Sequence, residues 1–185
     1  DMTAHLLERT PHRARITIRE LFEPLDLIAS SLPDSLAQDE IQKACQQLKI
    51  SGLQMMRLDL REDSSRLNGA LTETLRALNI TFDFAETAPE ERLTLLTRLL
   101  TSELPDLSTH PGITTPTAET WALFQLIKRV RDVYGAELLG PFVISMCQSA
   151  ADVLSVLLLA RWMGCDKGLQ IVPLFETIED LHEAP

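Results

Sequence analysis

Two charged residues stand where an apolar stretch gives way to a helical pattern, a position at which side chains can do chemistry. Glu176 follows the nearly continuous apolar run of residues 169–175. A carboxylate at such a point can hold a hard divalent cation through its oxygens. Arg61 follows the partly alternating run of residues 53–60. Its guanidinium can offer a planar fork to a carboxylate or a phosphate.

Each residue also has a purely structural interpretation, which spacing alone leaves open. Glu176 could complement the dipole of the helix that follows it. Arg61 could pair with Glu62, Asp63 or another neighbouring acid. The choice depends on the elements that position the two side chains.

Three strand–helix units carry these residues, and they cover residues 53–78, 141–163 and 168–182. Strands joined by helices predict a parallel sheet, and the carboxyl ends of parallel strands face one common crevice. The predicted fold class is therefore α/β, helix-rich, with about three parallel strands. These belong to an open sheet or to a barrel, which needs eight strands to close. Pro173 favours an edge or the end of a strand, because it cannot donate a ladder hydrogen bond.

The rest of the chain is predicted to be helical. Residues 1–52 form N-terminal helices, and residues 53–185 form the βα units of an incomplete α/β domain. An all-helical insert near residues 64–135 separates the first strand from the second. Within it one helix begins at Pro89, and another ends before Gly135, a natural residue to follow a helix.

Three stretches resemble phosphoenolpyruvate carboxylase. They are Arg57-Leu-Asp-Leu-Arg61-Glu-Asp-Ser64, then Ile144-Ser145-Met146 followed by Asp152-Val153-Leu154, and Val172-Pro-Leu-Phe-Glu176-Thr-Ile-Glu-Asp-Leu181 with the closing Ala184-Pro185. The resemblance implies a partial (β/α) TIM-type barrel segment in which Glu176 is a ligand of Mg²⁺ or Mn²⁺ and Arg61 contributes to the active site. It also implies that the full-length enzyme carboxylates phosphoenolpyruvate with bicarbonate to oxaloacetate and phosphate, as a homo-oligomer, a tetramer in the family.

The chain departs from the family pattern at several points. Glu62 and Asp63 stand where the family more often has Gln and Glu, and Ala151 replaces a serine, which removes a hydroxyl cap from the helix there. Ser145 and Asp152 are assigned no catalytic role. The family's Thr-Ala-His-Pro-Thr-Glu, Gly-Tyr-Ser-Asp and Arg-Gly-Gly motifs do not occur in these 185 residues. We therefore expect this polypeptide alone to be inactive.

Composition restricts the partners and the location. A net charge of −10 argues against non-specific binding to nucleic acid. The most apolar window, residues 153–160, is too short to span a membrane, and no signal-peptide pattern opens the sequence. We expect a soluble, cytoplasmic protein. Because the chain starts at Asp-Met and stops on Ala-Pro, we also expect an excised segment of a longer protein.

Two minor groups of residues are predicted to be structural. Cys147 and Cys165 lie in apolar surroundings and are expected to be buried, reduced thiols. Lys128, Arg129 and Arg131 form a basic patch on one helix. Such a patch is typical of a solvated face rather than a binding site.

Two other functions remain open at this point. The first is a different Mg²⁺-dependent barrel lyase or aldolase that acts on pyruvate-type enolates, which requires a second acid at a neighbouring strand end. The second is a non-catalytic helical regulatory or interaction domain. It predicts that Glu176→Gln and Arg61→Ala change nothing in the intact protein except its stability.

Overall fold

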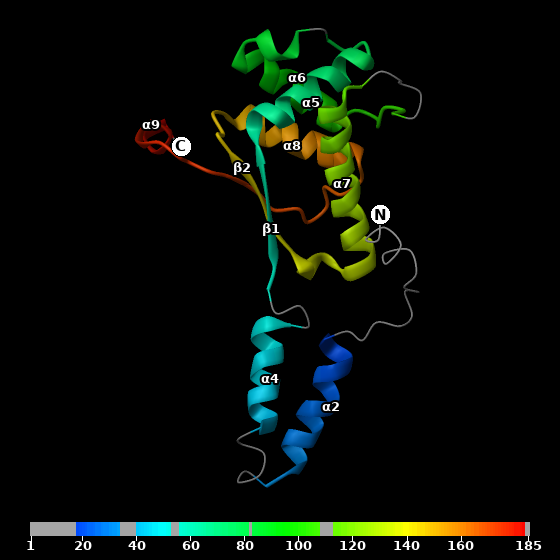
Figure 1. Cartoon of the computed structure of the whole chain (residues 1–185), viewed down its shortest axis with the longest axis vertical. Coiled ribbons are helices and arrows are strands. Elements are labelled where there is room, and N and C mark those ends of the chain that lie inside the picture. The colour runs from blue at the N-terminus through cyan, green and yellow to red at the C-terminus, as the bar shows by residue number, and fades with distance from the viewer. Residues whose placement is uncertain (1–17, 34–39, 53–55, 82, 108–112, 184–185) are drawn as a thin grey trace. The chain divides into compact units, whose positions relative to one another are not determined.

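The computed structural model describes residues 18–33, 40–52, 56–81, 83–107 and 113–183 (Figure 1). The chain divides into two compact units, Asp1–Arg57 and Leu58–Pro185. Within the described ranges no helix is both long enough and apolar enough to cross a membrane.

In its described residues the first unit has two helices that pack against each other, α2 (Ile18–Ser31) and α4 (Glu40–Ser51) (Figure 1). Helix α2 is amphipathic but buries none of its residues fully. Helix α4 buries Cys45, and the Nζ atom of Lys49 lies 4.8 Å from the centre of the Phe22 ring. An isolated helix pair of this size has little core of its own.

The second unit is built on a parallel sheet. Its strands are β1 (Leu58–Asp63), β2 (Leu139–Ser145) and β3 (Ile171–Pro173), in the order β1-β2-β3. Each strand leads into a helix, and these are α5 (Ser64–Ala77), α8 (Ala150–Trp162) and α9 (Ile178–Glu183). The predicted α/β class with three parallel strands is confirmed.

The bounds of two strands differ from the prediction. Strand β1 does not end before Arg61 but continues to Asp63, because Arg61 pairs with Val143 and Asp63 with Ser145 in the ladder to β2. Residues 53–55 of the predicted strand lie outside the described residues. Strand β3 is shorter than residues 169–175. The Leu169 N–H bonds to the Asp166 carbonyl in a turn at 3.1 Å, and Pro173 is the last residue of the strand.

The insert between β1 and β2 is helical. It contains a short 3-10 helix η2 (Phe84–Glu86), α6 (Pro89–Thr101), α7 (Thr115–Tyr134) and a second 3-10 helix η3 (Ala136–Leu138). Helix α6 begins at Pro89 as predicted. Helix α7 ends before Gly135, whose φ of 91° lies in the region that glycine adopts at little cost.

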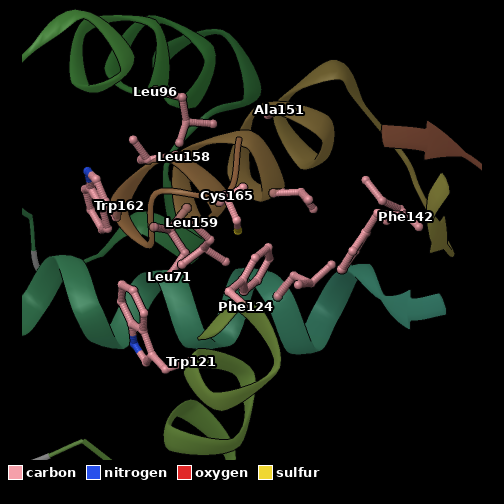
Figure 2. Packing of buried hydrophobic residues seen from close by; sticks show 14 of the residues in the cluster. Leu71, Leu96, Trp121, Phe124, Phe142, Ala151, Leu158, Leu159, Trp162 and Cys165 are labelled. Atoms are coloured by element: carbon pink, nitrogen blue, oxygen red, sulfur yellow. The ribbon is translucent and has the colours of Figure 1, made fainter. Parts of the chain in front are cut away.

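The core lies where α5, α7 and α8 meet the sheet (Figure 2). Phe124 of α7 stacks on Phe142 of β2 with their ring centres 5.6 Å apart, and Trp121 stacks on Trp162 at 6.4 Å. Helix α8 is apolar nearly all round and is buried on most sides, as its sequence predicts. This packing holds the amino ends of the helices near the carboxyl ends of the strands.

Glu73 of α5 caps the amino end of α7. Its carboxylate accepts hydrogen bonds from the Thr114 N–H at 2.9 Å, from the Thr114 hydroxyl at 2.7 Å and from the Thr117 hydroxyl. Burial opposes ionisation of Glu73, but the hydrogen bonds from Thr117 and Thr114 outweigh it and keep the pKa of this carboxyl below its usual value. The cap therefore favours the charged form of Glu73.

Asp152 caps the amino end of α8. Its carboxylate accepts hydrogen bonds from the N–H groups of Gln148 at 2.9 Å and Ser149 at 3.0 Å, and from the Asn68 side chain at 2.6 Å. Ala151 offers no hydroxyl at this helix end, and the carboxylate of Asp152, the third residue of the helix that begins after Ser149, supplies the acceptor instead.

The carboxyl end of α7 is tied to the turn after α8. The Arg131 guanidinium donates to the carbonyl of Cys165 at 2.6 Å and to that of Lys167. The interpretation of this basic patch as a solvated face is therefore wrong for Arg131, which satisfies carbonyl groups beyond a helix end. Cys147 and Cys165 are free and buried as predicted, and burial raises the pKa of Cys165 to about 11.

Candidate active site at the strand ends

The site lies at the carboxyl ends of the three strands, where each chain segment leaves the sheet. Arg61 is contributed by β1, two residues before the strand ends at Asp63. Glu176 follows β3, whose last residue is Pro173. Between them lies the end of β2 at Ser145, which Met146 follows. Because the strands are parallel, all three exits lie at the same edge of the sheet.

Arg61 and Glu176 form an ion pair. The Arg61 Nη2 atom donates to Glu176 Oε1 at 3.0 Å, although the two residues are 115 positions apart in the sequence. The Arg61 side chain is 60% exposed and that of Glu176 is 28% exposed. The structure therefore brings together the two residues that the sequence singles out, at a place open to solvent.

The acids next to Arg61 have other partners. The Glu62 Oε2 atom lies 3.6 Å from Arg66 Nη1. Asp63 accepts a hydrogen bond from the Ser65 N–H at 2.8 Å and caps the amino end of α5. The Ser65 hydroxyl and N–H lower the pKa of Asp63. The structural interpretation in which Arg61 pairs with either neighbour is wrong.

An acid other than Glu176 caps the amino end of α9. Asp180 accepts the N–H groups of Glu176 at 3.0 Å and Thr177 at 2.9 Å, and its own N–H bonds to the Thr177 hydroxyl at 3.0 Å. These bonds to Thr177 and Glu176 lower the pKa of Asp180. The carboxylate of Glu176 points instead to the other strand ends.

The second oxygen of Glu176 is held by the main chain directly after β2. The Met146 N–H donates to Glu176 Oε2 at 2.8 Å, and the Ser64 hydroxyl donates to the Met146 carbonyl at 2.6 Å. Met146 has a φ of 53°, a left-handed conformation that costs a non-glycine residue about 1–2 kcal/mol. Sequence reasoning missed this contact, because a main-chain donor leaves no mark on residue type.

The residues present fit a divalent ion only in part. Glu176 supplies a hard oxygen ligand, as Mg²⁺ and Mn²⁺ prefer. Among the described residues, however, no three His, Cys, Asp or Glu side chains come close enough together to hold a metal ion. An ion bound here would need further ligands from outside the part of the chain that is described.

Comparison with known proteins gives the same family that three stretches of the sequence resemble. The family model for phosphoenolpyruvate carboxylase matches residues 3–185. The chain is 34% identical over 176 residues to phosphoenolpyruvate carboxylase of Prochlorococcus marinus strain MIT 9301, covering 91% of this chain and 18% of that protein. It is 37% identical over 172 residues to the phosphoenolpyruvate carboxylase of Pseudomonas fluorescens strain Pf-5, covering 90% and 19%. The chain thus spans about a fifth of the length of these relatives.

Proposed function

Because the chain belongs to the phosphoenolpyruvate carboxylase family, we propose that it supplies one edge of the active site of a longer carboxy-lyase. That enzyme would add bicarbonate to phosphoenolpyruvate and release oxaloacetate and phosphate. The observation that carries the proposal is the ion pair of Arg61 with Glu176 at the shared end of three parallel strands. Family membership favours this reaction over another barrel lyase or a non-catalytic domain.

The two residues have complementary roles in this proposal. Glu176 offers an oxygen ligand to Mg²⁺ or Mn²⁺, and the bound ion would supply positive charge where the enolate oxygen develops. Arg61 would bind the phosphate and the bicarbonate-derived anion and neutralise the charge that builds up there. The net charge of −10 makes such local positive groups necessary for anionic substrates.

The three strands would form part of a TIM-type barrel, with residues 1–52 as appended helices and residues 53–185 as barrel units that carry the helical insert. Three strands cannot close a barrel. Large apolar side chains also remain exposed beyond β3, namely Phe175, Ile178 and Leu181. We propose that the rest of the longer polypeptide covers them and supplies the missing strands. The same polypeptide would be cytoplasmic and would assemble into a homo-oligomer, a tetramer.

The test uses the full-length protein that contains this chain. Glu176→Gln should abolish Mn²⁺ binding and the formation of oxaloacetate, while the protein stays folded. Wild-type turnover by the Glu176→Gln variant would contradict the ligand role. The 185-residue chain alone should be inactive, because one carboxylate and one arginine make neither a metal site nor a substrate site. Steady oxaloacetate formation by the isolated chain would refute that part of the proposal.

A further inference from the structure

We infer that Ser64 is a positioning residue for Glu176 and acts on it through the main chain of Met146. The inference rests on the proposed function, in which Glu176 is a metal ligand. It adds a residue outside the pair of charged groups that the sequence singles out. It also explains why a methionine at the end of β2 adopts a left-handed conformation.

The contacts form one continuous path across the strand ends. Ser64 follows β1, Met146 follows β2 and Glu176 follows β3. The Ser64 hydroxyl donates to the Met146 carbonyl at 2.6 Å. The N–H of the same residue, Met146, donates to Glu176 Oε2 at 2.8 Å. Two hydrogen bonds therefore join the segments that follow the three strands through a single residue, the one directly after the middle strand.

The conformation of Met146 decides where its two main-chain groups point. At a φ of 53° the chain turns away from the ladder directly after β2, so the N–H and the carbonyl address the flanking segments. A left-handed non-glycine residue persists where its surroundings fix it. The Ser64 hydroxyl is one such constraint, and the residue is well placed for it because Ser64 is only 8% exposed.

A second hydrogen bond supports the same arrangement. The Ser145 hydroxyl donates to the carbonyl of Glu62 at 3.2 Å, so the last residue of β2 is also tied to β1. The side chain of Met146, in contrast, is 55% exposed. The path to Glu176 therefore runs through the main chain of Met146, and the methionine side chain takes no part in it.

Without the Ser64 hydroxyl, the main chain of Met146 loses one of the bonds that fix it, and its N–H is held less firmly toward Glu176. The Glu176 carboxylate is then less well fixed in position, and an ion that binds to it must also order this side chain. Groups that orient a metal ligand typically account for about 10- to 100-fold in metal affinity. Because Ser64 acts through an intermediate residue, we expect the lower end, a loss of about tenfold in Ser64→Ala.

The experiment measures the Kd of Mn²⁺ by electron paramagnetic resonance, on the full-length protein and without phosphoenolpyruvate. Ser64→Ala should weaken binding about tenfold, while kcat at saturating Mn²⁺ changes by less than about threefold, since the ligand itself remains. The matched control is Ser65→Ala. The Ser65 hydroxyl bonds to Asp63 on the exposed face and has no link to Glu176. The Mn²⁺ Kd of Ser65→Ala should therefore stay within about twofold of wild type.

Two further variants separate the possible failures. Met146→Leu keeps the main chain and should bind Mn²⁺ like wild type; a tenfold loss would show that the side chain carries the effect and would overturn the inference. Glu176→Gln tests the proposed function itself. If Glu176→Gln loses Mn²⁺ but Ser64→Ala keeps the wild-type Kd, the positioning role of Ser64 is refuted and the ligand role stands. If Glu176→Gln binds normally, the ligand role fails first.

Discussion

Replacing Arg61 by glutamine should have opposite effects on metal binding and on catalysis. In the structure Arg61 occupies Glu176 Oε1 at 3.0 Å, so an ion that takes this oxygen must first displace the guanidinium. Arg61→Gln removes that competitor and its positive charge. The same substitution removes the group that would hold the anionic substrate. Metal affinity should therefore rise while turnover falls.

The size of the first effect follows from the exposure of the ion pair. With Arg61 60% exposed and Glu176 28% exposed, the pair belongs to the class that contributes about 0.2–1 kcal/mol. The upper part of that range corresponds to a two- to fivefold tighter Mn²⁺ Kd in Arg61→Gln, by roughly 1.4 kcal/mol per tenfold. The second effect is larger, because removing one group that stabilises transition-state charge lowers kcat by about 10²–10³.

Two assays on the full-length protein test this pair of effects. Mn²⁺ titration without phosphoenolpyruvate gives the Kd, and coupled oxidation of NADH gives the rate of oxaloacetate formation. The gain in affinity should shrink at 1 M salt, because exposed pairs are screened. Arg66→Gln is the control, since Arg66 pairs with Glu119 at 2.7 Å and has no contact with Glu176. A weaker Kd in Arg61→Gln, or unchanged turnover, would refute the reasoning.

Three further predictions concern stability, measured by thermal or chemical unfolding. Glu73→Gln should destabilise the protein by about 1 kcal/mol at neutral pH. Since the pKa of Glu73 is lowered from 4.5, its contribution is complete above that value and is lost as the pH falls through the folded-state pKa, so the variant should show a flatter acid limb; an identical limb would contradict this. Phe142→Ala should cost about 3–5 kcal/mol, whereas Val172→Ala, at an exposed position, should cost under about 0.5 kcal/mol; equal losses would show that the described core is wrong. Asp152→Ala should cost about 2 kcal/mol or more, because it leaves two main-chain N–H groups and Asn68 without their acceptor. A neutral Asp152→Ala would mean that water replaces the carboxylate.

The sequence predicts the strand–helix alternation well, because proline, glycine and apolar runs mark it locally. It places the end of β1 wrongly. Arg61, Glu62 and Asp63 read as the polar residues after a strand, yet they lie inside β1. The reason is that β1 lies at one side of the described sheet and its residues are partly exposed. Polar side chains are therefore tolerated in the strand, and only the ladder to β2 fixes where it ends.

The candidate site, like the fold, could be predicted from the sequence only in part. Arg61 and Glu176 can be identified by residue type and by their positions at the ends of apolar runs, and the parallel strands explain why they can meet. Their pairing is a property of the folded sheet, since many acids lie closer to Arg61 in sequence. The contribution of Ser64 and Met146 could not be predicted. A left-handed methionine has no sequence signature, because Gly and Asn are the residues that usually signal this conformation.

The two bonds to Glu176 differ in how readily they can be exchanged, and this difference bears on function. The pair with Arg61 is exposed and belongs to a weak class. The bond from Met146 is backed by a second hydrogen bond from a buried hydroxyl. An incoming cation would therefore displace Arg61 and leave the Met146 bond in place. In the proposed function, this displacement would also free the guanidinium to bind an anionic substrate. The Glu176 carboxylate would thus exchange Arg61 for a cation while the Met146 N–H, supported by the Ser64 hydroxyl, keeps it in place.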